Sequence, residues 1–351
     1  MMKKALHAVF VLVLAMGMLT FGLDASAKPI VLKWTTFEPD VPGATQNSLR
    51  RMAKLIEART EGRVKMKIYW GSVLGKAPDF LKMVGGHGVA DGAFLVTTYN
   101  QWEVPLFAAG GLPFLTKGYR VGPLATWELY NEWPAMQEEL RRVNVKPLWV
   151  FMPHPHWAGV KKKINSIEEL KGKKVWAAGY WQELVRALGI VNVPMIAPQA
   201  YDALQKGVIV GIIGMPYHTF KIFKYIETIK CLIEWPFGGQ PVCANVINLD
   251  VWNRISPKDR KAIEEIMAGM HDWFVAEVDK EATKLRGYFK SKGVKEIRLS
   301  DEEYKRIEEI GKKVVWSSWL KTAKEKGVPG EEWFRGYREK VAKCSKLYPA
   351  N

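Results

Sequence analysis

Two histidines separated by a single residue, His154 and His156, are side chains that could do chemistry. On a strand, residues i and i+2 point to one face, so the two imidazoles could share a metal ion or act as general bases. The neighbouring sequence suggests no third metal ligand. The pair leaves open an alternative interpretation, in which the protein is a periplasmic metal-dependent enzyme. We nevertheless expect neither a bound metal nor a cofactor.

Catalytic motifs are missing elsewhere in the sequence. It contains no G-x-S-x-G, H-E-x-x-H, P-loop or Cys-x-x-Cys pattern. The glycine-rich "GGHG" and "FGGQP" lack the G-x-G-x-x-G spacing of a dinucleotide site. Acidic residues are mostly mixed with basic ones in amphipathic segments, so spacing selects no carboxylate pair. We therefore expect a protein that is not an enzyme.

Aromatic side chains are abundant, with 15 Trp, 12 Tyr and 14 Phe. Most of them we assign to the core, especially those in the C-terminal helices. Another group falls at the ends of predicted strands, where open α/β sheets form their ligand crevices. This strand-end group consists of Phe37, Trp70, Tyr99, Trp157, Trp176 and Tyr217.

Apolar spacing predicts the elements that position these residues. Segments 30–37, 63–70 and 89–99 indicate strands separated by helices, which makes a β-α-β-α-β unit. A second unit follows, with predicted strands at 173–178 and 208–215. The sequence therefore predicts an α/β fold in which each domain is a mixed, mainly parallel sheet flanked by helices.

The chain is too long for one comfortable core, so we expect two domains. Domain I comprises residues 28–150 plus about 241–285. Domain II comprises residues 151–240 plus the C-terminal helices at about 286–351. The connections are short and contain no low-complexity linker, which predicts a hinge rather than a flexible tether.

Residues 1–27 are typical of a secretory signal peptide. They combine Lys3 and Lys4, an apolar stretch at 8–23 and the small-residue cleavage site Ala25-Ser26-Ala27. An uncleaved membrane anchor is the alternative that the cleavage site disfavours. The net charge of +16 comes from Lys and Arg interspersed with Glu, which indicates solvated helix faces. We expect a periplasmic protein that binds no nucleic acid.

The three cysteines leave at least one unpaired in an oxidising compartment. Cys231 and Cys243 flank the turn-rich "WPFGGQP", so a disulfide between them is one prediction. Three buried thiols are the alternative.

The order of three segments resembles the substrate-binding subunits of tripartite ATP-independent periplasmic (TRAP) transporters, of the DctP type. They are "RVKMKIYWGSVLG", "NSIEELKGKKVW" and "VNVPMIAPQAYDALQKGVIVG", and the resemblance spans about residues 32–273. It implies a two-domain periplasmic binding protein fold with a hinge and long C-terminal helices. It also implies an organic acid as ligand and a membrane permease as partner. The family implies a monomer, although the long C-terminal helix leaves a dimer open.

The resemblance also implies an atypical binding site. In the family an Arg in the pattern "LKGLKIR" pairs with the ligand carboxylate, a geometry that suits a bidentate contact. The matching position here is Trp176, and His156 stands where a second Arg often lies. Val210 and Ile212 replace polar residues of the family pattern. These exchanges favour an organic acid with apolar or aromatic bulk.

We therefore predict a ligand site with aromatic walls, in which His156 and backbone N–H groups near Gly214 to Tyr217 take the acid. A cation in an aromatic box and a neutral ligand remain alternatives. A role as a ligand sensor for a receptor, instead of a permease, also remains open. The predicted ligand-binding residues are Phe37, Trp70, Tyr99, His156, Trp157, Trp176, Gly214, Tyr217 and His218.

Overall fold

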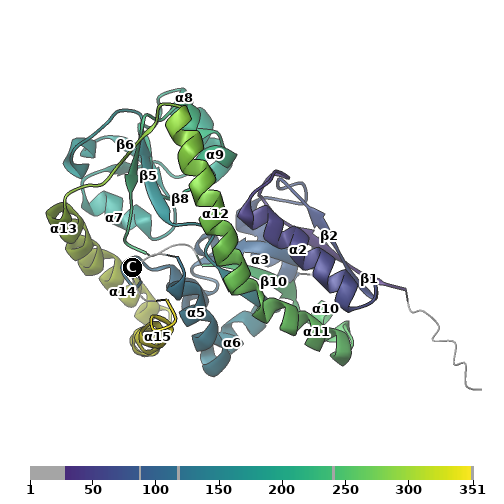
Figure 1. Ribbon diagram of the computed structural model, residues 1–351. Coiled ribbons are helices and arrows are strands. Elements are labelled where there is room, and N and C mark those ends of the chain that lie inside the picture. The colour runs from purple at the N-terminus through teal and green to yellow at the C-terminus, as the bar shows by residue number, and fades with distance from the viewer. Residues whose placement is uncertain (1–27, 87, 117–118, 239–241, 349–351) are drawn as a thin grey trace, which may run out of the picture.

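Two β-sheets flanked by helices organise the chain (Figure 1). The structure is a computed structural model that describes residues 28–86, 88–116, 119–238 and 242–348. The predicted signal peptide lies outside the described residues. Within the described ranges, no helix has both the length and the apolar character needed to cross a membrane.

The first sheet has the strand order β2-β1-β3-β10-β4. Its strands β2 and β3 run parallel to β1, whereas β10 runs antiparallel between β3 and β4. Since β10 comes from a distant part of the chain, the chain returns to the first sheet after building the second. The strand bounds are Ile30–Thr35 for β1, Val64–Tyr69 for β2, Gly92–Val96 for β3, Val145–Phe151 for β4 and Cys243–Asn248 for β10.

The second sheet has the order β11-β9-β5-β8-β6-β7. Strands β6, β7 and β8 are mutually parallel, and β5 is antiparallel to both β8 and β9. Both sheets are thus mixed, as predicted. The strand bounds are His156–Val160 for β5, Lys174–Ala177 for β6, Val191–Asn192 for β7, Gly211–Pro216 for β8, Cys231–Glu234 for β9 and Lys295–Ile297 for β11.

Helices cover both sheets, and short 3₁₀ turns join several of them. Those that contact strands of the first sheet are α2 (Ala44–Arg59), α3 (Phe80–Gly85), α5 (Val121–Glu132), α6 (Pro134–Arg142), α10 (Leu249–Arg254) and α11 (Pro257–Ala268), and α4 (Pro105–Ala108) packs on α6. Those that contact strands of the second sheet are α7 (Trp181–Ala187) and α9 (Thr219–Ile222), and α8 (Ala200–Gln205) packs on neighbouring 3₁₀ turns.

Helix α12, Met270–Ser291, bridges the two sheets (Figure 1). Near its start, Phe274 packs edge-on against Phe151 of β4, with ring centroids 5.1 Å apart. Near its end, Phe289 packs against Tyr217, which follows β8, with centroids 4.9 Å apart. One rigid helix therefore contacts both halves of the molecule.

The C-terminal helices also contact both halves. They are α13 (Asp301–Gly311), a π-helical turn (Lys312–Trp316), α14 (Ser317–Glu325) and α15 (Gly330–Cys344). The Ser166 hydroxyl, ahead of β6, donates to Glu303 of α13 at 2.8 Å. The Tyr337 hydroxyl of α15 donates to the carbonyl of Gly122 in α5 at 3.3 Å. The helices that we assigned to domain II from the sequence thus begin beside the second sheet and end against the first.

Local sequence explains how β6 is positioned. The Glu168 N–H donates to the Ser166 hydroxyl at 3.2 Å, and the Ser166 N–H donates to the Glu169 carboxylate at 3.3 Å, which completes a capping box. Gly172 then turns the chain with a φ of 71°, a conformation that favours glycine. Strand β6 follows at once and carries Trp176 to the edge where it faces the first sheet's loops.

The predicted disulfide between Cys231 and Cys243 is wrong. Cys231 begins β9 of the second sheet and is a free, buried thiol, whereas Cys243 begins β10 of the first sheet. The two cysteines are only twelve residues apart in the sequence, but they lie in different sheets. Burial raises the pKa of the Cys231 thiol, which keeps it protonated and unreactive at neutral pH.

Replacement of Gly92 by alanine should destabilise the first sheet. A Cβ at this position would lie 2.2 Å from the ring of the buried Trp34, and overpacking of this kind costs about 1–3 kcal/mol of unfolding free energy. The control is Gly287→Ala on α12, where a Cβ meets nothing within 4 Å and should stabilise the helix by about 0.8–1 kcal/mol. Urea denaturation measures both changes, and an undiminished stability of Gly92→Ala would contradict this packing.

Candidate ligand-binding site

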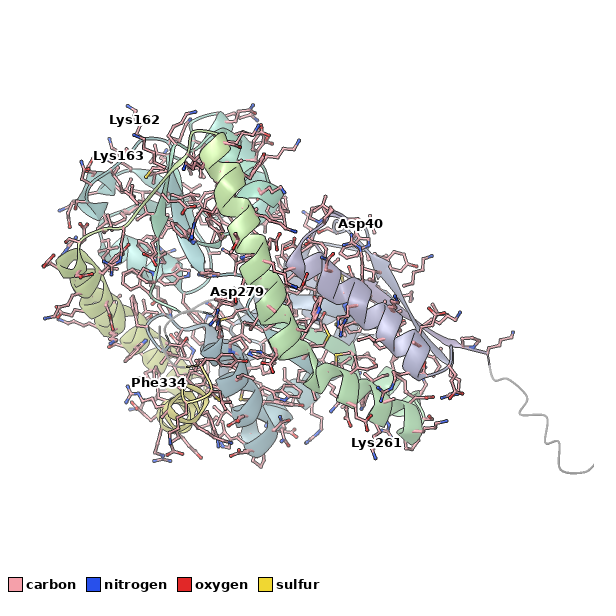
Figure 2. All side chains as sticks on the ribbon, viewed as in Figure 1. Asp40, Lys162, Lys163, Lys261, Asp279 and Phe334 are labelled. Atoms are coloured by element: carbon pink, nitrogen blue, oxygen red, sulfur yellow. The ribbon has the colours of Figure 1, made fainter. Side chains whose placement is uncertain are left out.

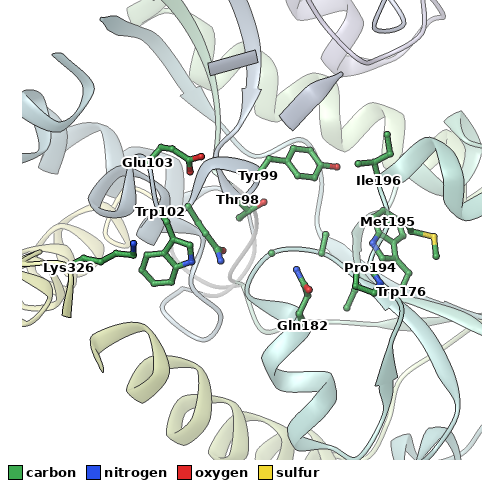
Figure 3. Close-up of a pocket in the computed structure, with 14 residues that line it drawn as sticks. Thr98, Tyr99, Trp102, Glu103, Trp176, Gln182, Pro194, Met195, Ile196 and Lys326 are labelled. Carbon is green, nitrogen blue, oxygen red and sulfur yellow. The ribbon is translucent and has the colours of Figure 1, made fainter. Parts of the chain in front are cut away.

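An open cleft of about 630 Å³, which we call the vestibule, lies between loops of the two halves (Figure 3). The first half contributes the segment from Thr98 to Glu103, and the second contributes the end of β6 and Pro194 to Ile196. Lys326, just after α14, lies across the vestibule from Trp176. Its ammonium group lies 5.8 Å from the centre of the Trp102 ring.

A narrower space of about 60 Å³, which we call the chamber, adjoins the vestibule. One water needs about 10–15 Å³ of such space, so the chamber has room for about five waters. Its lining includes five aromatic side chains, Phe37, Phe94, Tyr99, Trp176 and Phe223. The residues that line both spaces are Thr98, Tyr99, Trp176 and Ala178.

A stack of three phenylalanine rings joins the two halves at the chamber. Phe37, which follows β1, lies 5.3 Å from Phe94 of β3 and 6.4 Å from Phe223, which follows α9 of the second half. The interplanar angles are 25° and 7°, respectively. Such offset stacking contributes about 0.5–1.5 kcal/mol per pair beyond the burial of area.

Polar groups of the chamber include one carboxylate and one imidazole. Glu38 accepts a hydrogen bond from the Gln46 amide at 2.8 Å, and its other oxygen lies 3.7 Å from Nε2 of His218. Both side chains are almost fully buried. Neither ring nitrogen of His218 has a hydrogen-bond partner among the described residues. Burial raises the pKa of the Tyr99 hydroxyl to about 12, so this group stays protonated.

Behind His218, a buried hydrogen bond between His154 and Glu281 connects three elements. The ring of His154 stacks on His218 with centroids 4.7 Å apart, and its Nε2 lies 3.0 Å from a carboxylate oxygen of Glu281 on α12. The same oxygen accepts from the Ala44 N–H at the start of α2 at 2.8 Å. Glu281 therefore links α12, α2 and the chain crossing that precedes β5.

The pKa values of His154 and Glu281 are both lowered, for different physical reasons. Burial lowers the pKa of His154 to about 4, against the opposing pull of Glu281. Burial alone would raise the pKa of Glu281, but hydrogen bonds and charges from His154, His218 and the Ala44 N–H outweigh it and hold that pKa at about 2. The carboxylate thus stays ionised, and His154 is neutral at pH 7.

The structure separates the two predicted histidines. His154 precedes β5 instead of lying in it, so the alternation of a strand does not apply to the pair. His156 opens β5, lies 6.2 Å from the Trp181 ring and lines neither the chamber nor the vestibule. Burial lowers its pKa to about 3. The described ranges contain no group of three or more His, Cys, Asp or Glu side chains arranged to hold a metal ion.

Of the predicted ligand-binding residues, four line the chamber: Phe37, Tyr99, Trp176 and His218. Trp176 lies where the chamber meets the vestibule and is 1% exposed. Sequence reasoning missed Glu38, Phe94 and Phe223. Glu38 and Phe94 carried a usable signal, since one directly follows the strand-end Phe37 and the other lies in a predicted strand.

The other predicted residues contact protein and line neither space. The Arg50 guanidinium lies over the Trp70 ring at 5.1 Å. The Trp157 ring packs on Tyr217 at 5.1 Å, and the Tyr217 hydroxyl donates to Glu296. Gly214 adopts a φ of 73° against the Trp181 ring. These positions and His156 thus lie outside both spaces, and their role in ligand binding stays a prediction.

The sequence model of bacterial extracellular solute-binding protein family 7, DctP, matches residues 44–322. The chain belongs to this family. The predicted relation to TRAP solute-binding proteins is therefore confirmed. Members of the family are periplasmic receptors of transporters and not enzymes, as we expected for this chain.

Individual relatives agree with this assignment. "Outer membrane transporter protein TsaT" of Comamonas testosteroni is 28% identical over 307 residues, which cover 85% of this chain and 89% of the relative. A marine metagenome TRAP solute-binding protein specific for aromatic acid ligands, solved with metahydroxyphenylacetate, is 23% identical with a TM-score of 0.80. It covers 90% of this chain and 99% of its own.

A third relative is a TRAP solute-binding protein from Rhodoferax ferrireducens T118, solved with copurified benzoate. It is 22% identical with a TM-score of 0.80, over 91% of this chain and 99% of its own. The two solved structures confirm the predicted two-domain fold of periplasmic binding proteins.

Glu281→Gln should lower the unfolding free energy by about 1.5–3 kcal/mol at pH 7, because it weakens two hydrogen bonds to a buried charge. The folded pKa of about 2 lies below the unfolded value of 4.5. The carboxylate's contribution is therefore complete above pH 4.5 and is lost as the pH falls toward 2.

Glu277→Gln, one turn earlier on α12, is the matched control. Its carboxylate pairs only with the exposed Lys280, so its effect should stay within about 0.5 kcal/mol. Urea titrations at several pH values measure both variants. A Glu281→Gln effect no larger than that of the control would contradict the linking role of Glu281.

Proposed function

We propose that this protein is the extracytoplasmic solute-binding subunit of a TRAP transporter and binds an aromatic or apolar organic acid in the chamber. The observation that carries the proposal is the aromatic wall, to which Phe37 and Tyr99 contribute from one half and Trp176 from the other. Residues 28–150 with about 241–285, and residues 151–240 with about 286–351, act as two domains that close on the ligand.

The free energies of the two kinds of contact favour an aromatic or apolar acid as the ligand. An aromatic side chain offers about 150–250 Å² of contact area, which is worth several kcal/mol at about 25 cal/mol per Å² if a ligand buries it. A charge-assisted hydrogen bond contributes about 1.5–3 kcal/mol. Aromatic walls therefore offset the absence of an arginine for a ligand with a ring, but not for a small dicarboxylate.

The polar groups suggest how the ligand lies. Its ring would occupy the space between Trp176 and Phe37, and its carboxylate would point toward the unpartnered imidazole of His218. The relatives that carry aromatic acids in their solved structures support this choice of ligand.

The remaining features fit an exported receptor. Cleavage after Ala27 would release the mature chain into the periplasm, where we expect a monomer that docks on a membrane permease. The net charge of +16 attracts anionic ligands at long range. Lysines such as Lys162, Lys163 and Lys261 lie on the periphery of the molecule (Figure 2).

A ligand panel tests the proposed specificity. We expect isothermal titration calorimetry to give an affinity for benzoate, 3-hydroxybenzoate or phenylacetate at least about tenfold above that for succinate, a difference of about 1.4 kcal/mol. Tighter binding of succinate than of every aromatic acid would contradict the proposal.

Trp176→Ala should lower the affinity for the aromatic acid by more than about tenfold, because the aromatic ring between the chamber and the vestibule is lost. Trp70→Ala is the matched control, since Trp70 stacks under Arg50 and lines neither space, and it should leave the affinity within about twofold. Thermal melting shows that each variant is folded before calorimetry. An unchanged affinity of folded Trp176→Ala removes Trp176 from the site.

A further inference from the structure

The charges that line the chamber do not suit an anion. Glu38 is a buried carboxylate, and the described residues of the lining include neither lysine nor arginine. An ionised carboxylate buried without a partner cation is strongly unfavourable. A ligand carboxylate entering this space would lie close to a second carboxyl group, that of Glu38. Binding of an anion in the chamber therefore needs a positive charge, and the described lining residues supply no permanent one.

His218 is the side chain placed to supply that charge. It lines the chamber at 1% exposure, and its two ring nitrogens are without hydrogen-bond partners among the described residues. Nε2 lies 3.7 Å from Glu38, which is too long for a hydrogen bond and close enough to become one after a small shift. An imidazolium has two N–H donors, so it can serve Glu38 and a ligand carboxylate together.

Other titratable groups face His218 from several elements. His154 stacks on it from the crossing before β5, Glu281 lies behind His154 on α12, and His156 acts on it from β5. Tyr99 and Cys243 share the chamber lining from the first half. Glu38 and Glu281 are the acidic groups near His218, whereas His154 and His156 would repel an imidazolium there only if they were charged. Since burial lowers the pKa values of both of these histidines, they remain neutral at pH 7.

We propose that His218 is the carboxylate-binding residue of the chamber and that each anionic acid binds together with one proton, taken up by this imidazole. The inference rests on the proposed function. A buffer acid in solution releases the proton, which adds to a ring nitrogen of His218, so binding of the anion leaves the net charge of the chamber unchanged. The imidazolium then donates one N–H to Glu38 and the other to the ligand.

Linkage fixes the sign of the pH dependence. Binding that takes up a proton is favoured at low pH, so the association constant for the anion should fall by up to about tenfold per pH unit as the pH rises above neutrality. A neutral isostere needs no counter-charge and should bind with no such dependence. This contrast separates proton uptake at the site from a general effect of pH on the protein.

Calorimetry in two buffers measures the proton directly. Benzoate is titrated into the full-length mature protein at pH 7.5 in phosphate and in Tris, whose ionisation enthalpies differ, and benzamide serves as the neutral control. We expect uptake of about one proton with benzoate and none with benzamide. Benzoate binding without proton uptake overturns this inference and leaves the proposed function intact. Failure of every aromatic acid to bind overturns both.

A variant locates the proton. His218→Gln should abolish the uptake with benzoate and lower benzoate affinity at pH 6.5 by at least about tenfold, while benzamide affinity changes by less than about threefold. His271 lies beside Tyr348 and outside both spaces. His271→Gln should therefore change the affinity for neither ligand. Undiminished proton uptake by His218→Gln would place the proton on Glu38 or the ligand and overturn the assignment.

Glu38→Gln provides a second variant in case His218→Gln is unstable. Without the carboxylate, the chamber is neutral before binding, and an imidazolium loses its permanent partner. We therefore expect clearly less than one proton per benzoate and a flatter pH dependence than in the wild type. Uptake of a full proton by this variant would contradict the role of Glu38 as the partner of His218.

Discussion

The contact of Phe37 with Phe94 on one side and Phe223 on the other is the constraint on which the site depends. It places rings from both sheets around one small space, so the chamber exists only in the arrangement in which the two halves are close. Helix α12 and its Glu281 hold that arrangement from behind, by linking α2 with the crossing before β5. The aromatic walls, the buried carboxylate and the imidazole are all consequences of this closeness.

The sequence predicted the fold well, because the signals of its elements are local. Apolar spacing predicted strands at 30–37 and 63–70, which contain β1 and β2, and the strand predicted at 173–178 contains β6. These signals do not require knowledge of distant parts of the chain. The position of Trp176 at the edge of the site followed from the same reasoning, since a strand end in an open α/β sheet faces the crevice.

The sequence could not show which face of a strand another element covers. Trp157 and Tyr217 look like cleft residues, but Phe289 of α12 packs against Tyr217 and both belong to a buried cluster. His156 likewise lines neither space, and its ring lies 6.2 Å from that of Trp181. Phe223 lies just after a four-residue helix and has no periodic signal at all. Long-range packing decided each of these cases, and neither spacing nor residue type records it.

The central claim is that the chamber holds an aromatic acid without an arginine. Native mass spectrometry of the protein purified from the periplasm of its producing cells tests this most directly, followed by denaturing release and identification of any small molecule. The account predicts a single bound acid that carries an aromatic ring or comparable apolar bulk. Release of a small aliphatic dicarboxylate at full occupancy would contradict it, because the described residues of the chamber lining include no lysine or arginine to pair with a second carboxylate.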